Sequence, residues 1–101
     1  LVLSGHDHLY ARTYLMKGMK STGNASGLKK QGETLYLSGT SSTGSKFYEK
    51  ESGKKGYIAF YDGETEKTPL ISAITIQGKT LTIKTVRTTD MSVFDEITIR
   101  K

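Results

Sequence analysis

Both histidines of the chain, His6 and His8, stand two residues apart, directly after a short apolar run and a glycine. Residues i and i+2 of an extended chain point to the same side, so both imidazoles can face one site while Asp7 points away. Imidazole is a ligand for Zn, Fe, Mn, Ni and Cu. Because zinc takes three or four protein ligands, the pair predicts one part of a metal site whose other ligands come from elsewhere.

Two other interpretations of this stretch stay open. The two histidines could be an ordinary polar strand end. Alternatively, Ser4 could be the nucleophile of a Ser/His/Asp hydrolase, but it lies within the predicted strand and not on the sharp turn that such a nucleophile occupies. Asp7 is placed to support a ligating histidine and not to bind a metal itself.

A second stretch that could contact a ligand is the loop Gly39–Gly44, with the sequence GTSSTG. Its backbone N–H groups could bind a phosphate, as those of glycine-rich loops do. It lacks the Lys-Ser/Thr pair and the following helix of a P-loop. We therefore interpret it as a plain loop, with a role on the substrate side as the alternative.

The elements that position these residues are strands. Apolar residues recur with a period of two, and threonine lies mainly inside the alternating runs. This period predicts a mainly β fold, an antiparallel sheet or sandwich of about six strands. The clearest hairpin turns at Gln77-Gly78-Lys79. The predicted extended segments are residues 1–4, 10–16, 34–38, 56–61, 70–76, 80–87 and 93–99.

Three segments carry further predictions. Leu1–Ser4 is a continuous apolar run, which predicts a strand that is buried on both faces. In Val93–Ile99, the side chains of Ile97 and Ile99 are expected to point inward. Residues 17–33 are rich in Gly, Ser, Lys and Asn without any period, so we expect a long flexible loop. The chain thus divides into a metal-ligand strand and loop (1–16), the flexible loop (17–33) and a β meander (34–101).

Composition excludes several classes of protein. A chain of 101 residues is one domain or one piece of a domain. The absence of cysteine excludes a disulfide framework, a cysteine zinc site and a thiol nucleophile. No apolar run approaches the length of about 18 residues that a membrane-spanning helix needs. The net charge of +5 comes mainly from lysines that glutamates interrupt, so we expect neither a nucleic acid nor a membrane as partner.

Residues 1–13 resemble the last signature block of the calcineurin-like metallophosphoesterases, and most closely that of the purple acid phosphatase branch. There the block is an apolar strand, then Gly-His-x-His, a tyrosine and an Arg-Thr pair. This sequence has Gly5-His6-Asp7-His8, Tyr10 and Arg12-Thr13 at these places, while Ala11 departs from the acidic residue that is common there. Weaker likenesses follow at residues 34–39, 46–48, 56–57 and 94–96.

The resemblance implies a hydrolase of phosphate esters with two metal ions, expected to be Fe, Zn or Mn, which activate a water molecule for in-line attack. His6 would bind one ion, the divalent one of mixed-metal enzymes, and His8 the other, which is ferric in purple acid phosphatases. Tyr10 and Arg12 would flank the site in structural roles. The family's other ligands lie upstream of this block, so the chain alone is expected to be inactive and to bind metal weakly or not at all. The resemblance also favours a secreted or cell-surface location.

The sequence therefore predicts the C-terminal half of an α/β metallophosphoesterase fold, as a single C-terminal fragment (1–101). The start at Leu1, inside a predicted strand and without Met, also indicates a fragment. The alternative is a non-catalytic β-sandwich binding module with an incidental His-x-His. A fragment predicts that Leu1–Leu3 is apolar on both faces and lacks neighbours, with exposed strand edges through which the chain could dimerise. The module predicts a complete sandwich with protected edges.

Overall fold

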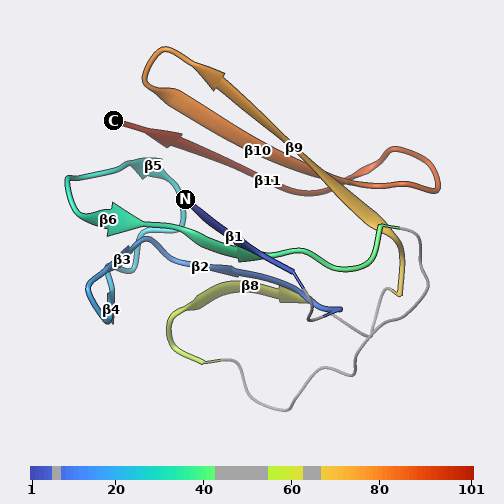
Figure 1. Ribbon diagram of the computed structural model, residues 1–101, viewed down its shortest axis with the longest axis horizontal. Coiled ribbons are helices and arrows are strands. Elements are labelled where there is room, and N and C mark those ends of the chain that lie inside the picture. The colour runs from blue at the N-terminus through green and yellow to red at the C-terminus, as the bar shows by residue number, and fades with distance from the viewer. Residues whose placement is uncertain (6–7, 43–54, 63–66) are drawn as a thin grey trace.

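The computed structural model describes residues 1–5, 8–42, 55–62 and 67–101. These residues form eleven strands in three sheets and contain no helix, which confirms the predicted mainly β class (Figure 1). In this part of the chain no helix is long and apolar enough to cross a membrane. His6 and Asp7 lie outside the described residues, as does the stretch 46–48.

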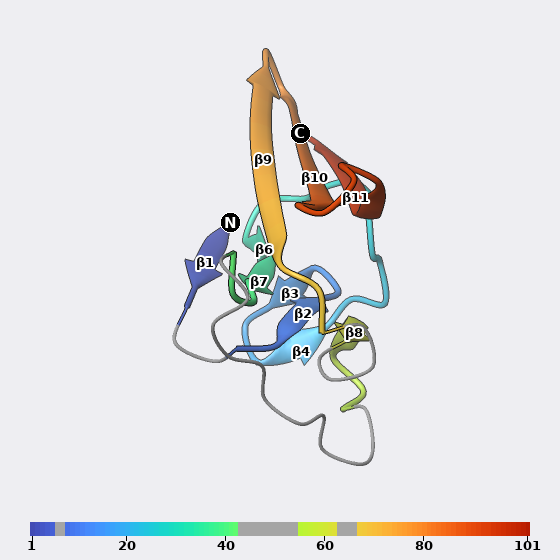
Figure 2. The same cartoon turned by 90° about the vertical axis from the view of Figure 1, so that its right-hand side faces the viewer.

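The first sheet contains both strands that border the histidines. Its strands are β1 (Val2–Ser4), β2 (Tyr10–Thr13), β7 (Tyr36–Ser38) and β8 (Ile58–Asp62). Their order is β1-β7-β2-β8, which can be followed across the lower half of Figure 2. β1 runs parallel to β7, whereas β2 is antiparallel to both of its neighbours. The parallel pair differs from the predicted antiparallel sheet, because strand direction depends on the path of the chain and not on periodicity.

The second sheet is built from the predicted hairpin and the last strand. Its strands are β5 (Gly27–Leu28), β9 (Leu70–Gln77), β10 (Thr80–Arg87) and β11 (Val93–Arg100), in the order β5-β11-β10-β9. Gln77 pairs with Thr80 in antiparallel register, so the hairpin turns where the sequence predicted it. Gly78 has a φ of 56° in this turn, a conformation that glycine adopts at low cost.

The third sheet lies within and around the segment that was expected to be a flexible loop. It contains β3 (Met16–Lys17), β4 (Lys20–Ser21) and β6 (Glu33–Thr34), in the order β4-β3-β6. β3 and β4 form a small hairpin, and Gly18 turns it with a φ of 61°. Strands of two residues are too short to show a period of two, which is why the sequence pattern did not reveal them.

The two larger sheets pack face to face and share two apolar clusters, and Figure 1 shows the second sheet above the first. Ile97 and Ile99 point inward as predicted, with exposed fractions of 3% and 7%. One cluster contains Leu15, Leu35, Ile83, Ile97 and Ile99, and the other contains Tyr10, Leu37 and Leu70, with Phe60 and Phe94 packed against it. These clusters attach the histidine-bearing sheet to the β9–β11 sheet.

β1 is the exposed edge strand of the first sheet (Figure 2). The exposed fractions of Leu1, Val2 and Leu3 are 43%, 44% and 55%. The prediction that this run is buried on both faces is therefore wrong for this chain, because the described residues provide no strand beyond β1 and no layer over its outer face. An apolar strand that lacks a neighbour on one side was instead the pattern expected of a fragment.

Candidate functional site

The stretch that carries the histidines connects two strands that are not neighbours. We call residues 5–9, between β1 and β2, the histidine loop. Its two ends lie on opposite sides of β7, because Ser38 pairs with Ser4 on one side and with Ala11 on the other. Neighbouring strands are about 4.8 Å apart, so the strands at the two ends of the loop are roughly 10 Å apart, one on each side of β7.

Two loops leave the first sheet together at this end. β1 and β7 are parallel, so the histidine loop and residues 39–42 start side by side. A hydrogen bond from the Gly39 N–H to the Ser4 carbonyl, with an N···O distance of 3.3 Å, joins their bases. Ligands of sheets with parallel strands bind outside the carboxyl ends of such strands. The topology therefore brings the starts of the two candidate stretches together, while residues 43–44 of the second stretch lie outside the described residues.

The structure places only one of the two predicted metal ligands. His8 is half-buried and precedes β2 by two residues, whereas His6 lies outside the described residues. That both imidazoles face one site stays a prediction. Among the described residues there is no group of three or more His, Cys, Asp or Glu side chains that could hold a metal ion. Two imidazoles on one loop fit a share of a dinuclear site, and the described residues do not supply the rest.

Asp95 of β11 binds two side chains of β2, the strand that follows His8, and so connects the two larger sheets. Arg12 donates from Nε to Oδ2 of Asp95 at 2.7 Å and from Nη2 to Oδ1 at 3.0 Å. Tyr10 donates from its hydroxyl to Oδ2 at 2.8 Å. All three residues are buried, so the start of β2 is tied to β11 by charge-assisted hydrogen bonds shielded from water.

These contacts set the protonation of Tyr10 and Arg12. Burial raises the pKa of Tyr10, and the negative charge of Asp95 raises it further, so its hydroxyl stays a hydrogen-bond donor at neutral pH. Burial alone would lower the pKa of Arg12, but the hydrogen bonds and the charge of Asp95 outweigh it and raise the pKa. Both side chains thus have the structural roles expected of them.

Sequence reasoning did not identify Asp95 as the partner of these residues. A signal was present, because Asp95 shares the inward face of β11 with Ile97 and Ile99, where an acidic side chain needs a buried partner. The partners themselves are 83 and 85 residues away along the chain. No local pattern could pair them.

Aromatic rings fix the orientation of Tyr10. Its ring meets Phe60 and Phe94 edge to face, with centroids 5.7 Å and 5.3 Å away. Such pairs stabilise beyond the area that they bury. The strand on which the histidine loop ends is thus held by rings from β8 and β11 as well as by Asp95.

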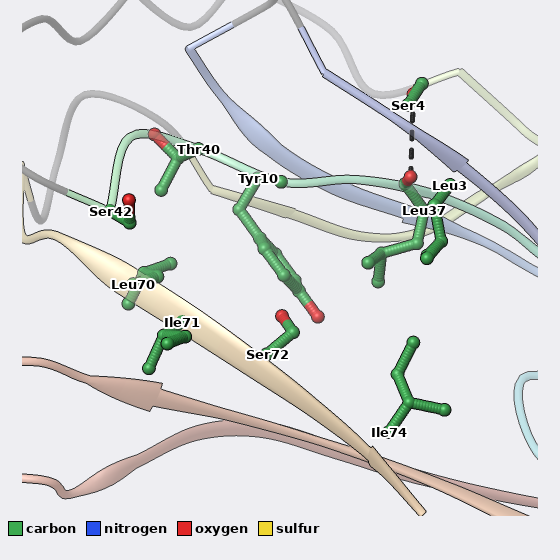
Figure 3. A pocket seen from close by; sticks show the side chains of 11 residues that line it. Leu3, Ser4, Tyr10, Leu37, Thr40, Ser42, Leu70, Ile71, Ser72 and Ile74 are labelled. Atoms are coloured by element: carbon green, nitrogen blue, oxygen red, sulfur yellow. Dashed lines mark hydrogen bonds between the residues drawn. The ribbon is translucent and has the colours of Figure 1, made fainter.

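Two hydroxyls at the end of β7 are buried without a hydrogen-bond partner among the described residues, Ser38 Oγ and Thr40 Oγ1. Thr40 also borders a cavity of about 260 Å³ between the two sheets (Figure 3). The floor of this cavity is apolar, with Leu3, Leu37 and Ile74 among its lining residues. In Figure 3 the hydroxyl of Thr40 points away from Leu70 and the cavity, while its methyl group points toward them.

The arrangement of the strands is similar to that in a segment of a purple acid phosphatase. A solved structure of such an enzyme, from seeds of the yellow lupin Lupinus luteus, superimposes with a TM-score of 0.77 over 97% of this chain, at 19% sequence identity. The chain spans 17% of the lupin chain. No protein-family model and no curated protein matches the sequence. The likeness shows the fold and does not favour the alternative of an independent binding module.

Proposed function

We propose that this chain is the C-terminal part of a metal-dependent phosphoesterase, to which it contributes His6 and His8 as ligands of a dinuclear centre. The observation that carries the proposal is the position of the histidine loop, which starts and ends beside the carboxyl end of β7 in a fold shared with a purple acid phosphatase. The exposed β1 supports it as well, because its apolar faces suit a sheet that continues in further polypeptide.

The chemistry divides between the metal ions and this chain. Two bound ions, of which Fe, Zn or Mn are the candidates, would activate a water molecule and neutralise charge on a phosphate ester. Neutral imidazoles of His6 and His8 would hold them, one on each. Asp95, through Tyr10 and Arg12, holds the strand at the far end of the histidine loop in place. The phosphate ester is the proposed substrate, and a secreted or cell-surface location is proposed with it.

The isolated chain provides the test. We expect it to bind Zn²⁺ or Mn²⁺ weakly, because it supplies two ligands where a complete site has three or four. A calorimetric or NMR titration should show this binding, and the double variant His6→Ala, His8→Ala should abolish it. We expect no turnover of p-nitrophenyl phosphate above that of the double variant. Equal metal binding by the chain and by the double variant would refute the proposal. Turnover by the chain alone would refute the expectation that the other metal ligands come from further polypeptide.

A further inference from the structure

A second cavity lies between the two larger sheets, at the far end of β1 from the histidine loop. Its volume of about 440 Å³ is within the range of about 300–1,000 Å³ that is typical of small-molecule sites. Leu1, just before β1, borders it, whereas the histidine loop leaves the other end of this strand. The β9–β10 hairpin and both termini lie at the same end of the molecule (Figure 1).

The inner part of this cavity is apolar. Leu35 and Ile99 line it and belong to one of the two buried clusters, against which Leu81 also packs. Ile76 lines the cavity as well, although 69% of its surface is exposed. Apolar surface that stays in contact with water gains free energy when an apolar group covers it. The cavity therefore favours an apolar ligand group such as an alkyl chain.

Three lysines line the same cavity, namely Lys29, Lys79 and Lys101. Two backbone hydrogen bonds hold them close together. The Lys101 N–H donates to the Lys79 carbonyl at 2.9 Å, and the Lys29 N–H donates to the carbonyl of Arg100, the residue before Lys101, at 2.6 Å. Lysine side chains lay their apolar stems along such a surface and keep the ammonium group in water. Positive charge therefore gathers at the mouth of an apolar cavity.

These positive charges are not neutralised by carboxylates of the described residues. The lining of the cavity contains no Asp or Glu, and within the described part of the chain none of the three lysines forms a salt bridge. Glu33 is near Lys29 in the sequence, but it is buried, and its carboxylate accepts the N–H of Lys30 at 2.9 Å. The mouth of the cavity is thus suited to an anionic group from a ligand.

A polar hollow adjoins the apolar cavity and shares two of its lysines, Lys29 and Lys101. Its volume is about 340 Å³, and its other lining residues are Lys30, Gln31 and Gly32. Ammonium and amide groups donate hydrogen bonds, and those from an ammonium group to a carboxylate are strengthened by charge. An apolar space and a space lined by donors therefore meet at the shared lysines.

We propose that this cavity binds an anionic amphiphile, a single alkyl chain that ends in a carboxylate. The chain lies against Leu35, Leu81 and Ile99, and the carboxylate lies among the lysines. The apolar walls favour this ligand over a small anion such as acetate. The charge at the mouth favours it over an amphiphile with a positive head group. The inference does not depend on the metal site, because none of the residues involved belongs to the histidine loop.

The experiment titrates the chain with sodium decanoate below its micelle concentration and follows the backbone amide signals by NMR. We expect the signals of Leu35, Leu81 and Ile99 to shift and saturate. Octanoate, which is shorter by two CH₂ groups, should bind about 10-fold more weakly. Decyltrimethylammonium has the same chain with a positive head group, and we expect little binding of it or of acetate. The affinity for decanoate should also fall as NaCl is added, because salt screens the lysines.

Two sets of variants separate the head group from the chain. The double variant Lys29→Gln, Lys101→Gln should bind decanoate about 10-fold more weakly, whereas Lys84→Gln, at an exposed position of β10 outside the cavity, should not change the affinity. Ile76→Ser should weaken binding, because it removes apolar wall from an exposed position that the fold tolerates. Val93→Ser, at an exposed position of β11 outside the cavity, is its matched control.

Each of several outcomes would overturn the proposal. Equal affinities for decanoate and decyltrimethylammonium, or for decanoate and acetate, would show that the head group or the chain contributes nothing. Unchanged binding by the double lysine variant would do so as well. Absence of decanoate binding also overturns it. If Ile76→Ser then shifts the chain toward the monomer in sedimentation, a second copy of the chain covers the cavity instead.

Discussion

At the scale of single residues, one carboxylate connects the histidine-bearing strand to the other sheet. Asp95 accepts three hydrogen bonds from Tyr10 and Arg12, at distances from 2.7 to 3.0 Å. A buried ion pair is weak evidence for stability by itself, but the loss of one partner leaves the other charge buried and unpaired. The stability of the fold therefore depends on the presence of both Asp95 and Arg12.

Asp95→Ala is expected to lower the free energy of unfolding by about 3–5 kcal/mol, because the Arg12 guanidinium then stays buried without its carboxylate. Urea denaturation measures the difference. Glu96→Ala is the matched control, since Glu96 is the next residue of β11 and is exposed, and it should change stability by less than about 0.5 kcal/mol. Equal effects of the two substitutions would contradict the role of Asp95.

Tyr10 makes the stability depend on pH at the alkaline end. Burial and Asp95 raise its pKa in the folded chain, whereas an unfolded tyrosine ionises near the ordinary value of 10.0. Above that pH the unfolded state binds fewer protons than the folded state, so the free energy of unfolding falls as the pH rises.

Tyr10→Phe should make this alkaline decline shallower, which denaturation curves between about pH 8 and 11 would show. It should also cost about 1.5–3 kcal/mol at neutral pH, since the hydrogen bond to the charged Asp95 is lost. Tyr57→Phe removes an exposed phenol and should keep the slope of the unaltered chain. Parallel curves for Tyr10→Phe and the unaltered chain would argue against the raised pKa.

At the scale of elements, the arrangement of β1, β7 and β2 decides where the histidine loop begins and ends. β7 lies between the other two strands, so its carboxyl end reaches the base of the histidine loop. β1 and β7 form a parallel pair, yet all of β1 is exposed whereas Leu37 of β7 is part of the core. Two residues that pair in this sheet can therefore differ in how deeply they are buried.

Leu3 and Leu37 are the clearest example of this difference in burial. They pair directly in the parallel ladder, and their exposed fractions are 55% and 4%. Leu37→Ala is expected to cost about 2–5 kcal/mol, as for a core leucine. Leu3→Ala should cost about 0.5 kcal/mol or less. Denaturant unfolding of both variants gives the comparison, and a cost for Leu3→Ala close to that of Leu37→Ala would show that β1 is covered in solution.

At the scale of the whole molecule, one edge strand of each of the two larger sheets carries no charge. β1 and β9 contain no Asp, Glu, Lys or Arg, although 25% of the chain's residues are of these types. Edge strands of soluble proteins are usually protected by charges, and an unprotected edge pairs with other chains. Ile74 and Ile76 of β9 add exposed apolar area, at 39% and 69%.

We expect the isolated chain to self-associate through these edges as its concentration rises, which sedimentation velocity would detect. Ile76→Lys places a charge on the exposed edge of β9 and should shift the distribution toward the monomer. Thr89→Lys adds the same charge in the turn between β10 and β11 and serves as control. A chain that stays monomeric at all concentrations, or an equal response to both substitutions, would contradict this expectation.

The sequence by itself determined the class of the fold and its local pieces. The period of two predicted the β class, the hairpin at Gln77-Gly78-Lys79 and the inward faces of Ile97 and Ile99, and all three are confirmed. Such features depend on neighbours within a few residues, so a single sequence records them. The histidine pair was recognised in the same way, from the types and spacing of adjacent residues.

Only the tertiary structure decided which strands lie at the two ends of the histidine loop. It placed β7 between the strands that carry the ends of the histidine loop, and it joined Tyr10 and Arg12 to Asp95. It also left β1 exposed where the sequence predicted burial. These contacts join residues far apart along the chain, and they depend on strand order and direction, which periodicity does not encode.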